Sequence, residues 1–411
     1  MKILNYFLVI CVGLIFTRCA HNPVSPEARD LTALEKSLVE SDNKFGLKLF
    51  KEIIKEEKDK NVFISPLSVS MALGMTLNGA NGETKAAMEQ TLELAGMTTE
   101  EINQSYKSLI ELLTNLDPKV IFQIANSIWC RQEITFEQEF INLNKTYFDA
   151  LVQALDFNDP NSVNIINAWV EENTNGKIKE IVDRIDSEIV MFLINAIYFK
   201  GTWTFEFDKD LTQDDLFTLP DGSQKTCKMM KLTGDLPYFE NELFQAVDLP
   251  YGDALFSMTI LLPKPQVDID SLITEINQEN WSQWMDSLSE QSVALSFPKF
   301  KLEYEIPLKE ILKAMGMAIA FEPYQADFTK MYTGPENVYI SKVKHKTFVE
   351  VNEEGTEAAA VTSVEVGITS IGPSAIPMRV DRPFVFVIRE NHSQTILFIG
   401  KIVEPIWSEN S

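Results

Sequence analysis

Two long apolar runs constrain the fold more than any other feature of this 411-residue sequence. They are VIFQIANSIWC at 120–130 and IVMFLINAIYFKGTW at 189–203, both rich in Ile, Val, Phe and Tyr. β-Branched and aromatic residues favour strands, and a continuous apolar run is typical of a strand that is covered on both faces. We therefore expect both runs in the middle of a large sheet.

The remaining elements are predicted to be mostly helices in the first half of the chain and mostly strands in the second. Ser65 followed by Pro66 is typical of a helix N-cap and its first helical residue. Apolar residues at helical spacing predict helices over 31–55, from Pro66 onward, after Gly82, and over 99–116, 162–178, 269–286 and 307–317. Strand-like segments dominate from 236 onward and include 337–351 and 382–402. Because no internal repeat is present, this order indicates the α+β class.

Composition allows a large core and argues against one class of partner. Hydrophobic residues make up 45% of the chain, enough for one large domain or two smaller ones. The formal net charge is −24. Because nucleic-acid binding needs clustered Lys and Arg to neutralise phosphates, we expect no nucleic-acid partner.

The first thirty residues have the layout of a leader followed by a tether. A basic Lys2, an apolar run over 3–16 and then Cys19 are typical of a signal peptide, here 1–19. Cys19 directly after that run resembles the lipidated Cys of a bacterial lipoprotein, which would anchor the chain to a membrane. Arg18 departs from the small residue usually found there, so ordinary cleavage remains an alternative. Residues 20–30, with two Pro, would be a short tether.

Residues that carry catalytic or metal chemistry are scarce. The three His are His21, His345 and His392, and no nucleophile elbow, metal-ligand spacing or phosphate-binding loop accompanies them. Cys130 and Cys227, both within apolar or strand-like sequence, are predicted to be free core thiols. The sequence therefore predicts neither an enzyme nor a cofactor or metal site.

Residues 353–374, EEGTEAAAVTSVEVGITSIGPS, form an unusual connection between two strand-like segments. They contain no aromatic residue, no Lys and no Arg. If they are written as a strand, Thr356, Ala358 and Ala360 share one uncharged face, and both Glu357 and Glu365 fall on the other. Gly355 would be a flexible pivot. Such a segment can enter a sheet without burying a charge.

The segment VEVNEEGTEAAAVT at 349–362 resembles the hinge of the serpins, the serine protease inhibitor superfamily. Further matches in family order are NVFISPLSVSMAL, NGANGET, INAWVEENTNGKI, LINAIYFKGTW, KFKLEYEIPLKEILKAMGM, RPFVFVIRE and ILFIGKIVEP. The resemblance implies a serpin fold in a single domain over 31–411, with three β-sheets, about eight or nine helices and an exposed reactive-centre loop at about 353–378.

The same resemblance implies a suicide-substrate mechanism. A serine protease cleaves the loop, forms a covalent acyl-enzyme and is trapped when the loop inserts into the central sheet. The hinge would comprise Glu353, Glu354, Gly355, Thr356, Glu357, Ala358, Ala359, Ala360 and Val361. Counting from Gly355 gives Thr369–Ser370 as the scissile bond, with bonds after Ile368 and Val366 as alternatives. These residues suit elastase-like and subtilisin-like proteases, with papain-like cysteine proteases as secondary targets.

Other positions match the family's polar cluster below the point where the sheet opens: Ser65, Ser68, Asn195 and His345. Trp203 matches the aromatic residue where insertion begins. The resemblance implies a monomer, and with the leader it indicates an exported protein of a bacterium, extracellular or anchored to the outer membrane. A serpin fold that no longer inhibits and acts as a chaperone or binding module is the second hypothesis. The small residues of the hinge argue against it.

Overall fold

The computed structural model describes residues 29–114, 116–335, 337–357 and 375–408. The expected leader at 1–19, Cys19 and most of the expected tether lie outside these residues. None of the helices in the described part of the chain is both long and apolar enough to cross a bilayer.

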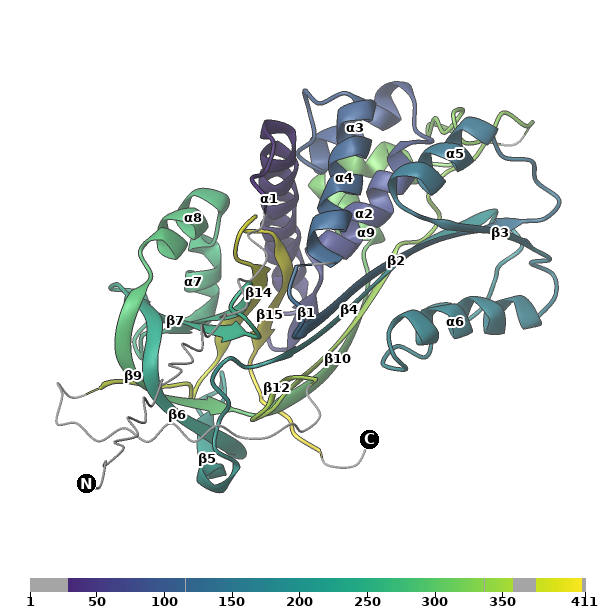
Figure 1. Cartoon of the computed structure of the whole chain (residues 1–411). Helices are drawn as coiled ribbons and strands as arrows, with labels where there is room; N and C mark the ends of the chain where they lie inside the picture. The colour runs from purple at the N-terminus through teal and green to yellow at the C-terminus, as the bar shows by residue number, and fades with distance from the viewer. Residues whose placement is uncertain (1–28, 115, 336, 358–374, 409–411) are drawn as a thin grey trace, which may run out of the picture.

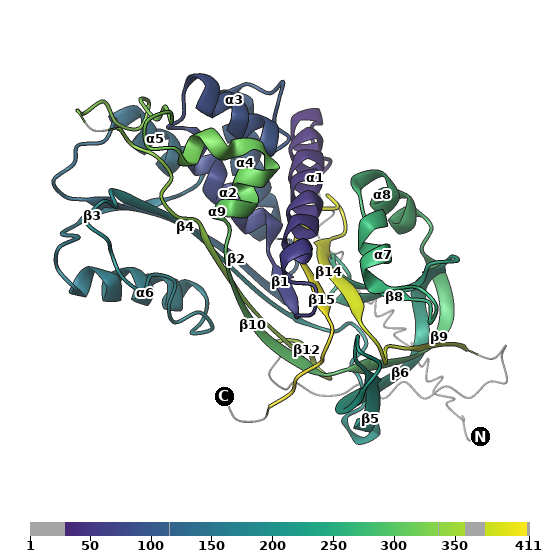
Figure 2. The same ribbon diagram turned by 180° about the vertical axis from the view of Figure 1, so that it is seen from behind.

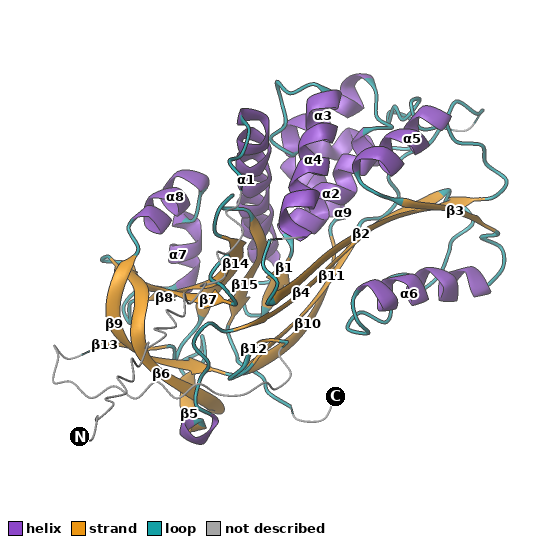
Figure 3. Ribbon diagram, viewed as in Figure 1, coloured by secondary structure: helices purple, strands orange, loops and turns teal. Residues whose placement is uncertain are grey.

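Nine α-helices occur among the described residues (Figure 3). They are α1 (Ala33–Glu56), α2 (Pro66–Leu77), α3 (Gly82–Thr91), α4 (Thr99–Thr114), α5 (Gln138–Tyr147), α6 (Asn161–Asn173), α7 (Ile269–Glu275), α8 (Gln278–Asp286) and α9 (Lys309–Leu312). The predicted start of α2 is confirmed, because the side chain of Ser65 accepts a hydrogen bond from the Ser68 N–H and Pro66 is the first helical residue.

One sheet has six strands. In spatial order they are β10 (Phe300–Pro307), β11 (Lys344–Val351), β12 (Gly355–Thr356), β4 (Met191–Thr202), β2 (Val120–Arg131) and β3 (Leu151–Leu155). Neighbouring strands are antiparallel except for the parallel pair β2–β3. The two apolar runs therefore form β2 and β4, adjacent strands inside this sheet, as predicted.

The other sheet has nine strands. In spatial order they are β1 (Val62–Ile64), β15 (Ile396–Ile402), β14 (Phe384–Glu390), β8 (Phe256–Pro263), β7 (Phe244–Tyr251), β6 (Gln224–Glu240), β9 (Ser289–Pro298) and β13 (Ile376–Arg379), with β5 (Gln213–Thr218) beside β6. The strands of the described residues thus join into two hydrogen-bonded networks. The 17-residue β6 links the two halves of the nine-stranded network, because along its length it pairs first with β5, then with β9 and finally with β7.

Helices lie on both faces of the six-stranded sheet, but unevenly. Figures 1 and 2 show α2 and α4 on one face and α6 alone on the other. The helix α6 buries Ile166 and Val170 against Trp129 of β2 and Ile194 of β4 in a small second core. The expectation that β2 is covered on both faces is therefore correct only for its second half. In its first half Ile121 is 45% exposed, because α6 does not reach it.

Strand β11 begins later than predicted. Residues 337–343, which the sequence suggested as the start of a strand, have no strand assignment. They line a cavity of about 200 Å³ between this segment, β4 and α2. The prediction of strand there was wrong because an apolar sequence forms a strand only where a neighbouring strand is available for pairing.

Candidate functional site

The candidate site lies at β12, where the two residues Gly355 and Thr356 occupy the space between β11 and β4. Gly355 is opposite Thr202 of β4, and Thr356 is opposite both Gly201 of β4 and Val351 of β11. In the described residues, this edge of β4 pairs with no other strand. The first two residues of the predicted inserting segment therefore already lie inside the sheet.

The fit of β12 depends on glycine and on one buried hydroxyl. Gly355 has φ +155°, and a Cβ at this position would lie 2.0 Å from the carbonyl oxygen of Gly201. Another residue cannot approach β4 so closely. The next side chain, Thr356, is buried, and its Oγ1 is 2.6 Å from the hydroxyl of Tyr251. This contact fixes the side chain of Thr356 toward the core, as the predicted alternation of faces requires.

Trp203 lies at the base of β12. Its ring stacks on Tyr251 with centroids 4.4 Å apart, and its indole N–H donates to the carbonyl of Asn352 at 3.0 Å. The backbone N–H of Trp203 donates to the carbonyl of Glu354 at 2.9 Å. The tryptophan therefore holds the segment that leads into β12.

Two acidic residues before Gly355 are anchored by ion pairs. The carboxylate of Glu353 lies 2.8 Å from Lys299 and accepts a hydrogen bond from Thr212 at 2.8 Å. Burial alone would raise the pKa of Glu353, but the bonds from Lys299 and Thr212 hold it below its usual value. Glu354 pairs with Lys209. This end of the inserting segment is thus fixed before any cleavage.

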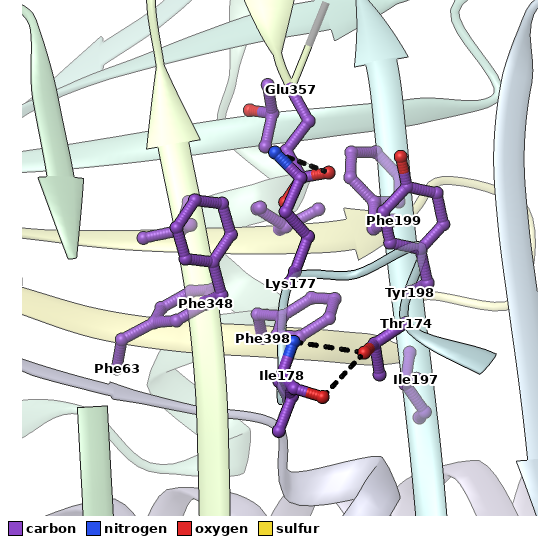
Figure 4. A pocket seen from close by; sticks show the side chains of 13 residues that line it. Phe63, Thr174, Lys177, Ile178, Ile197, Tyr198, Phe199, Phe348, Glu357 and Phe398 are labelled. Carbon is purple, nitrogen blue, oxygen red and sulfur yellow. Dashed lines mark hydrogen bonds and ion pairs between the residues drawn. The ribbon is translucent and has the colours of Figure 1, made fainter. Parts of the chain in front are cut away.

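Glu357 follows β12 and lines a small pocket shown in Figure 4. Its φ is +56°, a left-handed conformation, although its N–H still donates to the carbonyl of Glu350 at 3.0 Å. Burial raises the pKa of Glu357 to about 7, against the opposing effects of Lys177 and of a hydrogen bond with Tyr198. The pocket has a volume of about 20 Å³, enough for one water or a methyl group.

The polar residues matched in the sequence come together around the larger cavity. Ser65, Ser68, Asn195 and His345 all line it. The N–H of Ser65 donates to Nε2 of His345 at 3.0 Å, and the hydroxyl of Ser68 donates to the carbonyl of Asn195 at 3.3 Å. Burial lowers the pKa of His345 to about 4. Since its Nε2 accepts a hydrogen bond, this histidine is neutral and carries its proton on Nδ1.

Asn195 lies apart from His345 in its hydrogen bonding. Its side-chain NH₂ donates to Oδ1 of Asn126 at 2.9 Å, across the β4–β2 pair. Its buried Oδ1 has no hydrogen-bond partner among the described residues. Such an atom is costly to leave unpaired, so the side chain of Asn195 is only partly satisfied.

Several predicted positions lie outside the described residues. They are Ala358, Ala359, Ala360, Val361, Val366, Ile368, Thr369 and Ser370. The segments that flank them belong to different sheets, because β12 lies in the six-stranded sheet and β13 pairs with β9 in the nine-stranded one.

Sequence reasoning missed three residues that shape the site: Lys177, Tyr251 and Lys299. They come from the turn after α6, from β7 and from the junction of β9 and β10. No local pattern marks them. The free thiols Cys130 and Cys227 are confirmed and buried. Within the described ranges, no group of three or more His, Cys, Asp or Glu could hold a metal.

Comparisons with known proteins agree on one family. The family model described as Serpin (serine protease inhibitor) matches residues 40–405. Serpin B10 of Otolemur garnettii is 38% identical over 397 residues, covering 90% of this chain and 99% of that protein.

Solved structures of serpins also resemble this chain over most of its length. The thermophilic serpin tengpin in its native state has a TM-score of 0.83 and 34% identity, with 92% of this chain and 95% of that chain covered. Human thyroxine-binding globulin complexed with thyroxine has a TM-score of 0.82 and 26% identity, with 91% of this chain and all of that chain covered. The family match spans most of the sequence, and the chain therefore belongs to the serpin family.

Proposed function

We propose that this chain inhibits proteases as a suicide substrate. The nucleophilic oxygen of a target serine protease attacks the carbonyl carbon of the scissile bond and forms an ester. The peptide C–N bond breaks, and the new amine leaves with the proton that the protease's base took from its serine. The freed loop then enters the sheet beside β4 before water hydrolyses the ester.

The observation that carries this proposal is the edge of β4 that faces β11, which in the described residues pairs only with β12. Two residues of the hinge pair with its C-terminal end, and the larger cavity continues between β4 and residues 337–347. If the register of β12 is extended, Ala358 would lie opposite Phe199 and Val349, the residues that line the small pocket. A methyl side chain suits a pocket of about 20 Å³.

The energetics favour insertion once the loop is cut. Residues 358–369 would add about a dozen ladder hydrogen bonds, each worth roughly 1 kcal/mol net. Their inward side chains would fill the cavity and add apolar burial. The uncut form is then held by kinetics and not by lying lowest in free energy.

We assign the polar cluster and Trp203 to control of this opening. Ser65 links the start of α2 to His345 of β11, and Ser68 links it to the backbone of Asn195 on β4, whose side-chain Oδ1 has no partner among the described residues. Trp203 would guide the hinge, because it already binds the backbone of Asn352 and Glu354.

The target preference follows from the loop sequence. Cleavage at Thr369–Ser370, or after Ile368 or Val366, would suit elastase-like and subtilisin-like serine proteases, with papain-like cysteine proteases as secondary targets. No Lys or Arg precedes Arg379 in this part of the chain, so trypsin-like proteases are poor candidates. The inhibitor is expected to act as a monomer.

The test is direct. The protein is incubated with pancreatic elastase, subtilisin and trypsin, and the products are separated in SDS. We expect SDS-resistant complexes with the first two, and a C-terminal fragment whose mass gives the cut site. Cleavage by all three without any complex would contradict the proposal.

A second candidate function is ligand binding without inhibition. Human thyroxine-binding globulin is 26% identical, and the larger cavity is lined by many apolar side chains. A chain that binds a ligand and does not inhibit would be cut in its loop without forming an SDS-resistant complex. Formation of such complexes with elastase would exclude this alternative.

We further propose that the chain is exported by a bacterium and anchored through a lipid on Cys19. Metabolic labelling with a radioactive fatty acid tests this, with Cys19→Ser as the control. Labelling of the wild type alone supports the anchor. A mature N-terminus without lipid would support ordinary cleavage.

A further inference from the structure

Glu357, the residue that follows β12, combines two unfavourable features. Its backbone is left-handed, with φ +56°, a conformation that costs free energy for residues other than glycine. An inserted strand would require a negative φ at this residue. Continued insertion therefore relieves the strain at Glu357.

The carboxylate of Glu357 is also buried without full compensation. Its side chain is 4% exposed, and the nearest cation, Nζ of Lys177, is 3.8 Å from Oε2. That oxygen has no hydrogen-bond donor in the described part of the chain. Burying a poorly paired carboxylate disfavours its charged form, which agrees with the raised pKa of about 7.

The groups around this carboxylate come from four elements. Lys177 follows α6, Tyr198 and Lys200 lie on β4, and Glu350 lies on β11. On β10, the ammonium group of Lys301 lies 3.8 Å from Glu350. Both Lys301 and Lys177 lie over the ring of Phe348. Lys177 is thus the ion-pair partner of Glu357 among the described residues, and Glu350 opposes the ionisation of Glu357.

Lys177 also lies next to the space that the proposed insertion would fill. With Thr174 and Ile178 it lines the small pocket beneath the turn after α6, as Figure 4 shows. We infer that this turn moves away when residues after Glu357 enter between β4 and β11, and that water then reaches the carboxylate of Glu357.

We propose that Glu357 is a pH-dependent trigger that sets the rate of loop insertion, and this rests on the inhibitory function proposed above. When its carboxylate is ionised, the resting hinge, with Glu357 buried, is destabilised and insertion is fast. When the carboxylate is protonated, the resting hinge is more stable and insertion is slow. The sign follows from proton binding: the resting hinge binds a proton more tightly than the opened, hydrated one, so acid favours the resting state.

The test compares wild type with Glu357→Gln, which imitates the protonated side chain. The rate of formation of the SDS-resistant complex is measured with one protease from pH 6 to pH 8. The wild-type rate is divided by the Glu357→Gln rate at each pH. This ratio cancels the protease's own pH dependence and that of Asp42, whose pKa burial also raises to about 7. We expect a ratio near one at pH 6 that rises about fivefold by pH 8.

Two further variants sharpen the result. Lys177→Met removes the compensating cation and should move the midpoint of the wild-type transition to higher pH. Glu303→Gln makes the same substitution at an exposed glutamate of β10 that pairs with Lys346 of β11, and the ratio of the wild-type rate to its rate should not vary with pH. A constant ratio for Glu357→Gln, with complexes still forming normally, would overturn the trigger. Absence of complexes in the wild type would instead overturn the proposed function.

Discussion

The two edges of β4 have different neighbours along their length. Toward β2, the strand pairs continuously from Gly201 opposite Val120 to Met191 opposite Cys130, and Asn195 adds a side-chain hydrogen bond to Asn126. Toward β11, the described residues supply only Gly355 and Thr356 as partners. Because unpaired backbone groups in a sheet are costly, pairing a new strand with the second edge would lower the free energy of the folded protein. One apolar strand can thus stabilise the fold on one side and accept a new strand on the other.

The largest effect should come from Thr356→Arg on the open edge. The guanidinium would be forced against the hydroxyl of Tyr251 and the ring of Trp203, where the native side chain is buried. Burial of an unpaired cation opposes insertion, so we expect cleavage without covalent complex. Gel analysis with elastase measures it, and Thr356→Ser is the matched control. A mutant that still forms the full amount of complex would show that this position need not be buried.

The next effect is a pH dependence from His345. Its folded pKa of about 4 lies below its ordinary value near 6.5. The unfolded chain therefore binds a proton more readily, and stability falls as the pH falls from about 6.5 to 4, by up to about 3 kcal/mol. Urea unfolding of wild type and of His345→Gln isolates the contribution of His345 to the free energy of unfolding, because all other titratable groups are the same in both proteins. Parallel curves over this range would mean that the histidine is not held neutral.

A smaller loss is expected from Glu353→Gln at the anchored end of β12. The change leaves Lys299, whose side chain is 15% exposed, without its carboxylate partner. We expect the free energy of unfolding to decrease by about 2 kcal/mol and the open edge to pair more readily between molecules. Denaturation curves and size-exclusion chromatography measure the two effects. Lys299→Met should restore part of the stability in the double variant, and no restoration would argue against this ion pair as the cause.

The closed edge should tolerate change. Ile121 of β2 is 45% exposed, and Ile121→Thr keeps a β-branched side chain there. We expect a change in unfolding free energy within about 0.5 kcal/mol and unaltered complex formation. A loss of inhibition from this substitution would mean that both edges of β4 control insertion.

Much of the fold could be predicted because its signals are local. Ser65 and Pro66 define the start of α2, and the runs that became β2 and β4 carry strand composition throughout. Strands β3 and β5 were not predicted. Their sequences, LVQAL and QDDLFT, are short or polar, and their pairing with β2 and β6 stabilises them.

The candidate site was only partly predictable, for a related reason. Gly355 and Thr356 could be identified from their own sequence and from its resemblance to a family. Tyr251, Lys177 and Lys299 meet the hinge only after distant segments fold together. The end of strand pairing at Lys344 likewise depends on a missing neighbour, which no property of residues 337–343 reveals.

Hydrogen exchange of β4 and β11 before and after cleavage by elastase reports whether the cut loop inserts beside β4. In the intact protein, backbone amides on the open edge of these strands should exchange faster than those that pair β4 with β2. After cleavage, we expect strong new protection across 191–202 and 344–351, together with a higher melting temperature. Unchanged exchange in both segments of the cleaved protein would contradict insertion beside β4.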